Sequence, residues 1–256
     1  MTHQIKSYFR FLWSSKNRHG VHSPFVYNLV TQCFNDKKRY PEYQVFDLYR
    51  KRLLKNSEVL TISDFGEGSR VFKENQRKVS RIARVSAVTK KRQRLLFRLS
   101  RYLEAENILE LGTSLGMGTL AFSLSGKEKT IETVEGCPSV FKKAKEGLDT
   151  FSCGNIEMHQ MVFSDFLNIN DKKYDIILVD GDHNGERTYR YFQSLLSHVH
   201  NDSLVIFDDI YWSKDMTATW NKIIAHEQSI VTIDTFQWGM VFFRKEQRKQ
   251  HFILRI

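Results

Sequence analysis

The side chains best suited to chemistry in this chain follow two apolar segments. Residues 174–180 end in Asp180, residues 203–208 end in Asp208 and are followed by Asp209, and His183 lies three residues after Asp180. If both segments are parallel strands of one sheet, their carboxyl ends share the edge at which open α/β folds bind ligands. Carboxylates gathered there repel one another, and a hard cation such as Mg²⁺ relieves that repulsion. Asp180, Asp208 and Asp209 are therefore candidate metal ligands, although acids also occupy such positions without a metal.

His183 has two interpretations. Imidazole changes its charge near neutral pH and can act as a general base, which makes His183 a candidate catalytic residue beside Asp180 and Asp208. A histidine at a strand-to-helix turn can equally have a structural or capping role.

A glycine-containing loop lies upstream, in the run ILELGTSLGMGT at residues 108–119. Gly112 can adopt a positive φ and allows the main chain to approach a ligand closely. The spacing Glu110-x-Gly112-x-x-x-Gly116 differs from the G-x-G-x-x-G of dinucleotide folds, because Ser114 stands where the second glycine would be. No Gly-Lys-Ser/Thr follows, which excludes a P-loop.

Two further acids follow the next predicted strands. Glu135 ends residues 130–135, where a carboxylate can accept hydrogen bonds from both hydroxyls of a ribose. Asp165 follows residues 156–161. Either acid could also be an ordinary surface residue at a strand end.

The elements that must position these residues alternate from residue 107 onward. Apolar runs at 108–111, 130–135, 156–161, 174–180 and 203–208 predict strands, and 117–125, 139–150, 186–199 and 215–227 predict helices. Such alternation indicates a parallel sheet with right-handed crossovers. Residues 229–237 and 240–244, joined by Trp238-Gly239, predict an antiparallel hairpin. The expected fold is α/β and Rossmann-like, with seven mostly parallel strands.

The first 104 residues differ in composition and form a basic, mainly helical extension before the domain at 105–256. They carry 23 basic and 8 acidic side chains, whereas the whole chain has a net charge of +10. Ser23 and Pro24 predict a helix start, and residues 71–102 predict two helices, with a glycine-containing turn at 64–69 before them. The surplus could face nucleic acid, anionic lipid or an acidic substrate, or it could be a solvated face.

The loop and the order of elements resemble those of class I S-adenosylmethionine-dependent methyltransferases, with Glu110 to Gly116 as motif I. The resemblance implies S-adenosyl-L-methionine as the cofactor. Its implied cofactor-binding residues are Glu110, Gly112, Thr113, Ser114 and Gly116 in the loop, Glu135 and Gly136 at the ribose, Asp165 at the adenine, and Asp180.

The acids at the later strand ends resemble those of the catechol and caffeoyl-coenzyme A type O-methyltransferases, which bind a divalent metal. Two positions depart from that pattern, since Asp209 replaces an asparagine and His183 replaces a catalytic lysine. The chain also resembles a bacterial group of class I methyltransferases at residues 18–25, 64–69 and 207–214, a likeness that brings no acceptor with it. The implied function is methyl transfer to an oxygen of a small molecule.

Two alternatives stay open. A nucleic-acid (RNA) methyltransferase could use the basic extension to follow phosphates, although no Asn/Asp-Pro-Pro-Tyr motif follows Val179. A non-catalytic module could keep only the cofactor site, although Gly112 and Glu135 are both present.

Expectations for location and partners follow from composition. The three scattered cysteines predict reduced thiols and a cytoplasmic protein. The sequence contains no run of 18 uncharged apolar residues, so no membrane span is predicted. The expected partner is a small, anionic acceptor, and a homodimer is compatible with the sequence. We predict that Arg18, with His19 or His22, reaches the pocket containing His183 and Asp208. Tyr211, Trp212 and Trp238 either line that pocket or pack in the core.

Overall fold

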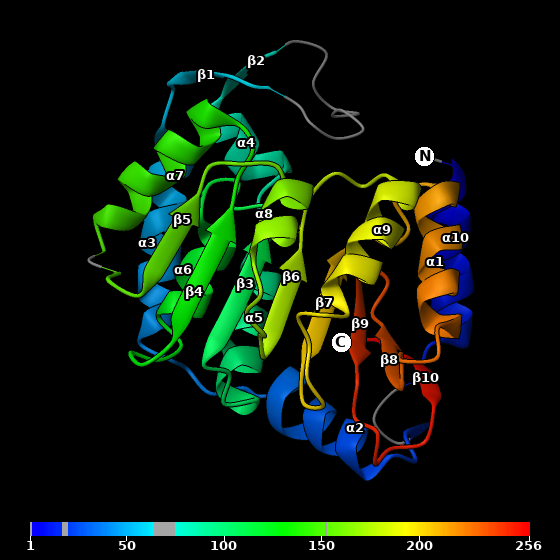
Figure 1. Cartoon of the computed structure of the whole chain (residues 1–256). Helices are drawn as coiled ribbons and strands as arrows, with labels where there is room; N and C mark the ends of the chain where they lie inside the picture. Colours follow the sequence, from blue (N-terminus) through cyan, green and yellow to red (C-terminus); the bar gives the residue numbers. More distant parts are fainter. Residues whose placement is uncertain (1, 17–19, 64–74, 152) are drawn as a thin grey trace.

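The structure is a computed structural model that describes residues 2–16, 20–63, 75–151 and 153–256. Its centre is a sheet in the order β10-β8-β9-β7-β6-β3-β4-β5. The strands are β3 (Asn107–Leu111), β4 (Thr130–Val134), β5 (Ile156–His159), β6 (Ile176–Val179), β7 (Leu204–Asp208), β8 (Val231–Asp234), β9 (Trp238–Phe242) and β10 (Gln250–Ile253). Figure 1 shows β3 to β7 side by side with their carboxyl ends along one edge.

The predicted α/β fold with a mostly parallel sheet is confirmed, with two differences in detail. The sheet has eight strands rather than seven, because β10 pairs in parallel with β8. The antiparallel strand β9 lies between β7 and β8, and the connection before it is 235–237, so Trp238 and Gly239 belong to the strand itself. A larger residue does not fit at position 239, because the ring of Trp220 packs where the side chain would be.

Helices cover both faces of the sheet. One face packs on α8 (Phe163–Ile169), α9 (Gly185–Leu195) and α10 (Lys214–Ala225), and the other on α6 (Met117–Ser123), α7 (Pro138–Asp149) and part of the N-terminal segment. Residues Ile108 and Leu109 illustrate the arrangement: they are adjacent and fully buried, but belong to the two opposite core clusters. Successive strand residues point to opposite faces, so apolar residues at both positions build a three-layer domain.

The N-terminal segment shares a core with the sheet. It contains α1 (Thr2–Ser14), α2 (Pro24–Asn28), the π-helix η2 (Leu29–Phe34), α3 (Glu42–Lys55), β1 (Val59–Thr61), β2 (Gln76–Lys78), α4 (Val79–Val85) and α5 (Lys90–Tyr102). Ser23 caps α2 through the N–H of Val26, with Pro24 in the first turn, as predicted. The predicted pair of helices within 71–102 corresponds to α4 and α5, whereas the predicted turn at 64–69 lies outside the described residues.

The α5 helix brings the extension onto the sheet. Leu95, Leu96 and Leu99 are almost fully buried in the cluster that also contains Ile108 and Leu120. Because these side chains follow the helical repeat, they form a stripe of α5 that faces the core. No described helix is long and apolar enough to cross a bilayer.

Candidate active site

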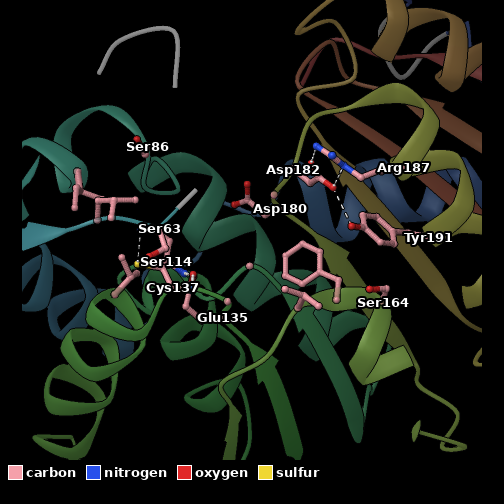
Figure 2. Close-up of a pocket in the computed structure, with 18 of the residues that line it drawn as sticks. Ser63, Ser86, Ser114, Glu135, Cys137, Ser164, Asp180, Asp182, Arg187 and Tyr191 are labelled. Carbon is pink, nitrogen blue, oxygen red and sulfur yellow. Dashed lines mark hydrogen bonds and ion pairs between the residues drawn. The ribbon is translucent and has the colours of Figure 1, made fainter. Parts of the chain in front are cut away.

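A cavity of about 410 Å³ lies at the carboxyl edge of the sheet. Its floor comes from the residues that follow four strands: Gly112 and Ser114 after β3, 135–137 after β4, 162–164 after β5, and 180–182 after β6. Ile62, Ser63, Arg77, Ile82 and Ser86 of the N-terminal segment complete one wall. Figure 2 shows that Ser63, Ser114 and Glu135 lie on one side of it, and Asp182, Arg187 and Tyr191 on the other.

Gly112 is required by close contact between two strands. Its φ is +111°, and a Cβ there would lie 2.8 Å from the carbonyl carbon of Asp180 and closer still to the oxygen. The N–H groups of Gly112 and Thr113 donate to the carbonyl of Val134 at 2.9 and 3.2 Å. The loop is therefore fixed to both neighbouring strands, and a side chain at position 112 cannot be accommodated without moving one of them.

Glu135 is held in one orientation by main-chain donors. Its carboxylate accepts hydrogen bonds from the N–H of Ser114 at 3.0 Å and from the N–H of Cys137 at 2.9 Å. Each oxygen of an ionised carboxylate can accept more than one hydrogen bond. Glu135, which lines the cavity with Gly136, can thus also accept from a ligand.

Several predicted cofactor residues lie below the cavity rather than in its lining. Glu110 is 1% exposed, accepts hydrogen bonds from the hydroxyls of Thr119 and Thr133, and has its pKa raised to about 7 by burial. Thr113 is buried and its hydroxyl lies 2.6 Å from that of Thr133. Gly116 directly precedes α6 as its N-cap, with a φ of +71°. These residues support the loop from beneath.

Asp165 is placed differently from the prediction as well. It is exposed in the first turn of α8 and does not belong to the described lining, in which Val162, Phe163 and Ser164 represent this strand end. The α8 helix, which sequence periodicity did not predict, begins at Phe163 and directs these side chains into the cavity.

The acids after β6 and β7 do meet, and His183 joins them. Asp180, His183 and Asp208 each place one ligand atom within 4.8 Å of the others. Asp180 also lines the cavity. Burial and the neighbouring Asp208 raise the pKa of Asp180 well above its usual range, and burial raises that of Asp209 to about 6. Two of the three predicted ligands belong to this set together with His183, and Asp209 lies close enough to act electrostatically on Asp180.

The main chain around this cluster is strained. Asp182, His183 and Asp209 have φ values of +68°, +32° and +50°. Positive φ is uncommon for residues other than glycine, and such residues gather at functional sites, where the surrounding structure imposes them. The ring of His183 lies 5.6 Å from that of Trp212, which supports it on one side.

Sequence reasoning missed Arg92. This residue comes from the first turn of α5, and its guanidinium Nη1 lies 2.6 Å from Oδ1 of Asp208. The two side chains are only 18% and 8% exposed, and the guanidinium lies 5.9 Å from the ring centre of Trp238. In the sequence, Arg92 is one of many cations on the polar side of an amphipathic helix, and no local signal distinguishes it.

The arrangement does not fit a divalent cation. Asp208 is already paired with a cation, and a metal bound to the same carboxylate would lie close to the guanidinium. At about 4 Å, two unit positive charges repel by roughly 4 kcal/mol near a protein surface, and a dication by about twice that.

A second missed group forms the far wall of the cavity. Arg187 donates to Asp182 through Nε at 2.6 Å and through Nη2, and the hydroxyl of Tyr191 donates to Asp182 at 2.8 Å. Phe163 packs edge-on against Tyr191, with ring centres 5.7 Å apart. These contacts connect α9 to the strained turn after β6 and hold its conformation.

The three aromatic residues predicted at the pocket or in the core lie in different surroundings. Trp238 is 2% exposed in β9, where it pairs with Asp208. Tyr211 is partly buried and its hydroxyl donates to Asp234, whereas Trp212 contacts His183. Arg18 and His19 lie outside the described residues.

His22 precedes α2, whose Phe25 packs on Phe242 with ring centres 5.0 Å apart. Phe242 pairs with Leu204 at the start of β7, and Asp208 at its other end is roughly 13 Å away. His22 therefore does not reach the pocket, because α2 covers the opposite edge of the sheet, and the predicted pairing of Arg18 with His19 lies outside the described residues.

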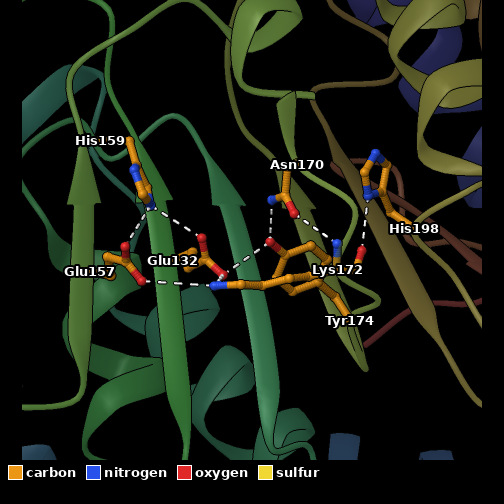
Figure 3. A network of polar contacts seen from close by, with 7 residues as sticks. All are labelled: Glu132, Glu157, His159, Asn170, Lys172, Tyr174 and His198. Atoms are coloured by element: carbon orange, nitrogen blue, oxygen red, sulfur yellow. Dashed lines mark hydrogen bonds and ion pairs between the residues drawn. The ribbon is translucent and has the colours of Figure 1, made fainter. Parts of the chain in front are cut away.

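A second acidic cluster lies on the sheet surface away from this site. Glu132, Glu157 and His159 have ligand atoms within 4.8 Å of one another. Figure 3 shows Lys172 and Tyr174 reaching the same buried carboxylate, with Lys172 Nζ 2.7 Å from Oε1 of Glu132. Since the lysine and the histidine already contact Glu132, this network stabilises a buried acid.

Known proteins share a sequence family and a fold with this chain. Residues 109–210 match the family described as a methyltransferase domain. No curated protein sequence matches the chain. Among solved structures, SAH-bound PaMTH1 of Podospora anserina is 12% identical, covers 88% of this chain and 97% of its own, and has a TM-score of 0.61.

Two O-methyltransferase structures show the same fold. The enzyme from Bacillus cereus in complex with SAH is 14% identical over 85% of this chain and 97% of its own, with a TM-score of 0.55. TomG of Streptomyces achromogenes in complex with SAM is 16% identical over 82% and 92%, with a TM-score of 0.54. Residues 109–210 therefore match a methyltransferase domain, and the chain as a whole has the fold of these methyltransferase structures.

Proposed function

We propose that the chain transfers a methyl group from S-adenosylmethionine to an oxygen atom of a small molecule. One observation carries the proposal: Asp180 belongs both to the lining of the cavity and to the cluster with His183 and Asp208. A ligand in the cavity therefore extends toward a base and a cation at the same edge. The O-methyltransferases named above share this fold and support the choice of oxygen.

The cavity residues divide between the parts of the cofactor. Glu135 accepts hydrogen bonds from the ribose hydroxyls, because its carboxylate is already oriented by Ser114 and Cys137. Gly112 allows the methionine part to lie against the main chain. Val162, Phe163 and Ser164 contact the adenine, the role that the family resemblance implied for Asp165.

The chemical step is an in-line displacement at the sulfonium methyl. As the acceptor hydroxyl loses its proton to the imidazole of His183, its oxygen forms a bond to the methyl carbon, the carbon–sulfur bond breaks, and the electron pair of that bond neutralises the sulfur. The protein contributes mainly by holding the two reactants in line. Trp212 restricts the ring of His183 and thereby supports this role.

The test is a methyl-transfer assay with labelled S-adenosylmethionine and a panel of phenols, catechols, carboxylic acids and RNA. We expect O-methylated phenols or carboxylic acids, identified by mass spectrometry. The His183→Gln variant should lower kcat by about 10²–10⁴-fold and leave the binding of S-adenosylhomocysteine unchanged. Labelling of RNA alone would replace the proposal with the nucleic-acid alternative, and cofactor binding without transfer to any acceptor would favour the non-catalytic one.

A further inference from the structure

The N-terminal segment places one cation into the acidic edge of the sheet. Arg92 lies in the first turn of α5, and α5 is anchored by Leu95, Leu96 and Leu99, all at most 2% exposed. Its guanidinium therefore approaches Asp208 from a fixed helix rather than from a mobile loop. The 2.6 Å contact and the low exposure of both side chains make this a buried ion pair.

The guanidinium has donor capacity beyond this pair. An arginine has five N–H donors in a rigid plane. Nη1 donates to Asp208, whereas Nε is buried and has no hydrogen-bond acceptor among the described residues. Arg92 also lines a small cavity of about 80 Å³ together with Leu95, Gln237 and Trp238. Donors that are desolvated and incompletely used are suited to bind an oxygen that carries negative charge.

Charge at the edge favours a cation in this place. Asp180, Asp208 and Asp209 all act on Arg92 electrostatically, and His183 is the other basic group next to Asp209. A single fixed guanidinium beside Asp208 reduces the mutual repulsion of these acids, which is the task a metal would otherwise perform. It also blocks a metal, because a dication on Asp180, His183 and Asp208 would be repelled by Arg92.

We propose that Arg92 takes the place of a divalent cation at this edge, excluding metal from Asp180, His183 and Asp208 and donating to the oxygen of an acidic acceptor such as a phenol or a carboxylic acid. The part that concerns the acceptor rests on the proposed O-methylation, whereas the exclusion of metal does not. During transfer the guanidinium stabilises negative charge on the acceptor oxygen as His183 takes the proton.

The test is a titration with Mn²⁺ alone as the probe, on the protein saturated with S-adenosylhomocysteine. Free Mn²⁺ is followed by electron paramagnetic resonance, so no acceptor has to be known. We expect no binding below about 1 mM to the wild-type protein, and at least ~100-fold tighter binding to Arg92→Met, because the repulsion is removed while the ligands remain. Arg94→Met is the matched control on the same helix, where the cation pairs with Asp47, and it should behave as wild type.

Two further measurements complete the test. Arg92→Gln, a smaller change, should also gain Mn²⁺ binding and is used if Arg92→Met does not fold. Arg92→Lys keeps the charge and should bind no Mn²⁺. Tight Mn²⁺ binding to the wild-type protein, or none to either neutral variant when folded, overturns the exclusion of metal.

A separate measurement tests whether Arg92 donates to the acceptor oxygen. With an acceptor found in the panel above, chelation should leave wild-type turnover unchanged, and Arg92→Lys should raise KM for anionic acceptors by about 10-fold or more, since the fork of donors is lost. An unchanged KM in Arg92→Lys overturns this part. If no acceptor is methylated, the proposed function fails while the Mn²⁺ titration still decides the role of Arg92.

Discussion

Replacing Gly112 with alanine tests how closely the cofactor loop depends on contact between β3 and β6. The residue has a φ of +111°, and the added Cβ would overlap the main-chain carbonyl of Asp180. This neighbour cannot move away easily, because the N–H of Asp180 donates to Leu111 at 2.8 Å within the sheet. The left-handed backbone costs about 1–2 kcal/mol, and relief of the overlap adds a similar amount.

A penalty of about 2–4 kcal/mol in the loop corresponds to a loss of roughly 30- to 700-fold in affinity. We therefore expect Gly112→Ala to weaken binding of S-adenosylhomocysteine by this factor, measured by calorimetry, with a folded protein by circular dichroism. Gly154→Ala is the matched control, since nothing lies within 4 Å of the added Cβ and its φ needs no glycine. A folded Gly112→Ala protein that binds within about threefold of wild type would refute the reasoning, because a 3-fold change is only ~0.7 kcal/mol.

The remaining predictions concern stability. Burial raises the pKa of Glu110 from 4.5 to about 7, so the folded state binds this proton more tightly than the unfolded state, and the stability from this group rises as the pH falls from about 7 to about 4.5. Glu110→Gln should therefore flatten the pH dependence of unfolding by urea in that window, and an unchanged profile would contradict the assignment. The hydroxyl of Tyr49 in α3 donates to the carbonyl of Leu115 at 2.7 Å and so joins the N-terminal extension to the loop before α6. Tyr49→Phe should therefore lower the free energy of unfolding by about 1–2 kcal/mol. Tyr27→Phe, at an exposed ring, is its control and should change nothing measurable.

Local patterns were sufficient for much of the domain from residue 107 onward. Strands β3, β4, β6 and β7 each contain at least four consecutive buried residues, and such runs are evident in a sequence because a sheet covered on both faces needs mostly apolar residues. The helix start at Ser23-Pro24 was predictable for a similar reason, since capping depends on residues adjacent in the chain. By contrast β10, which begins with Gln250 and is half exposed, carries no such pattern and exists only because it pairs with β8.

For the site too, some features follow from the sequence and others only from tertiary packing. The sequence determines that acids follow β6 and β7, that a glycine follows β3 and that Glu135 follows β4. These residues gather in one place because strand ends in a parallel sheet share one edge. Which of these residues face a ligand was decided by tertiary packing. Glu110 lies beneath the loop rather than in the cavity, since alternate residues of a strand point to opposite sides.

Arg92 and His22 show why the extension could not be placed in advance. Both belong to a basic segment whose charges look alike in the sequence, yet α5 brings Arg92 within 2.6 Å of Asp208, and α2 holds the segment after His22 at the other end of β7. The distance in sequence between Arg92 and Asp208 is 116 residues, so no local propensity records their contact. The sequence thus determined the sheet, its edge and the acids along it, whereas only the packing of the extension decided which cation meets them, because that depends on how two separate apolar surfaces fit together.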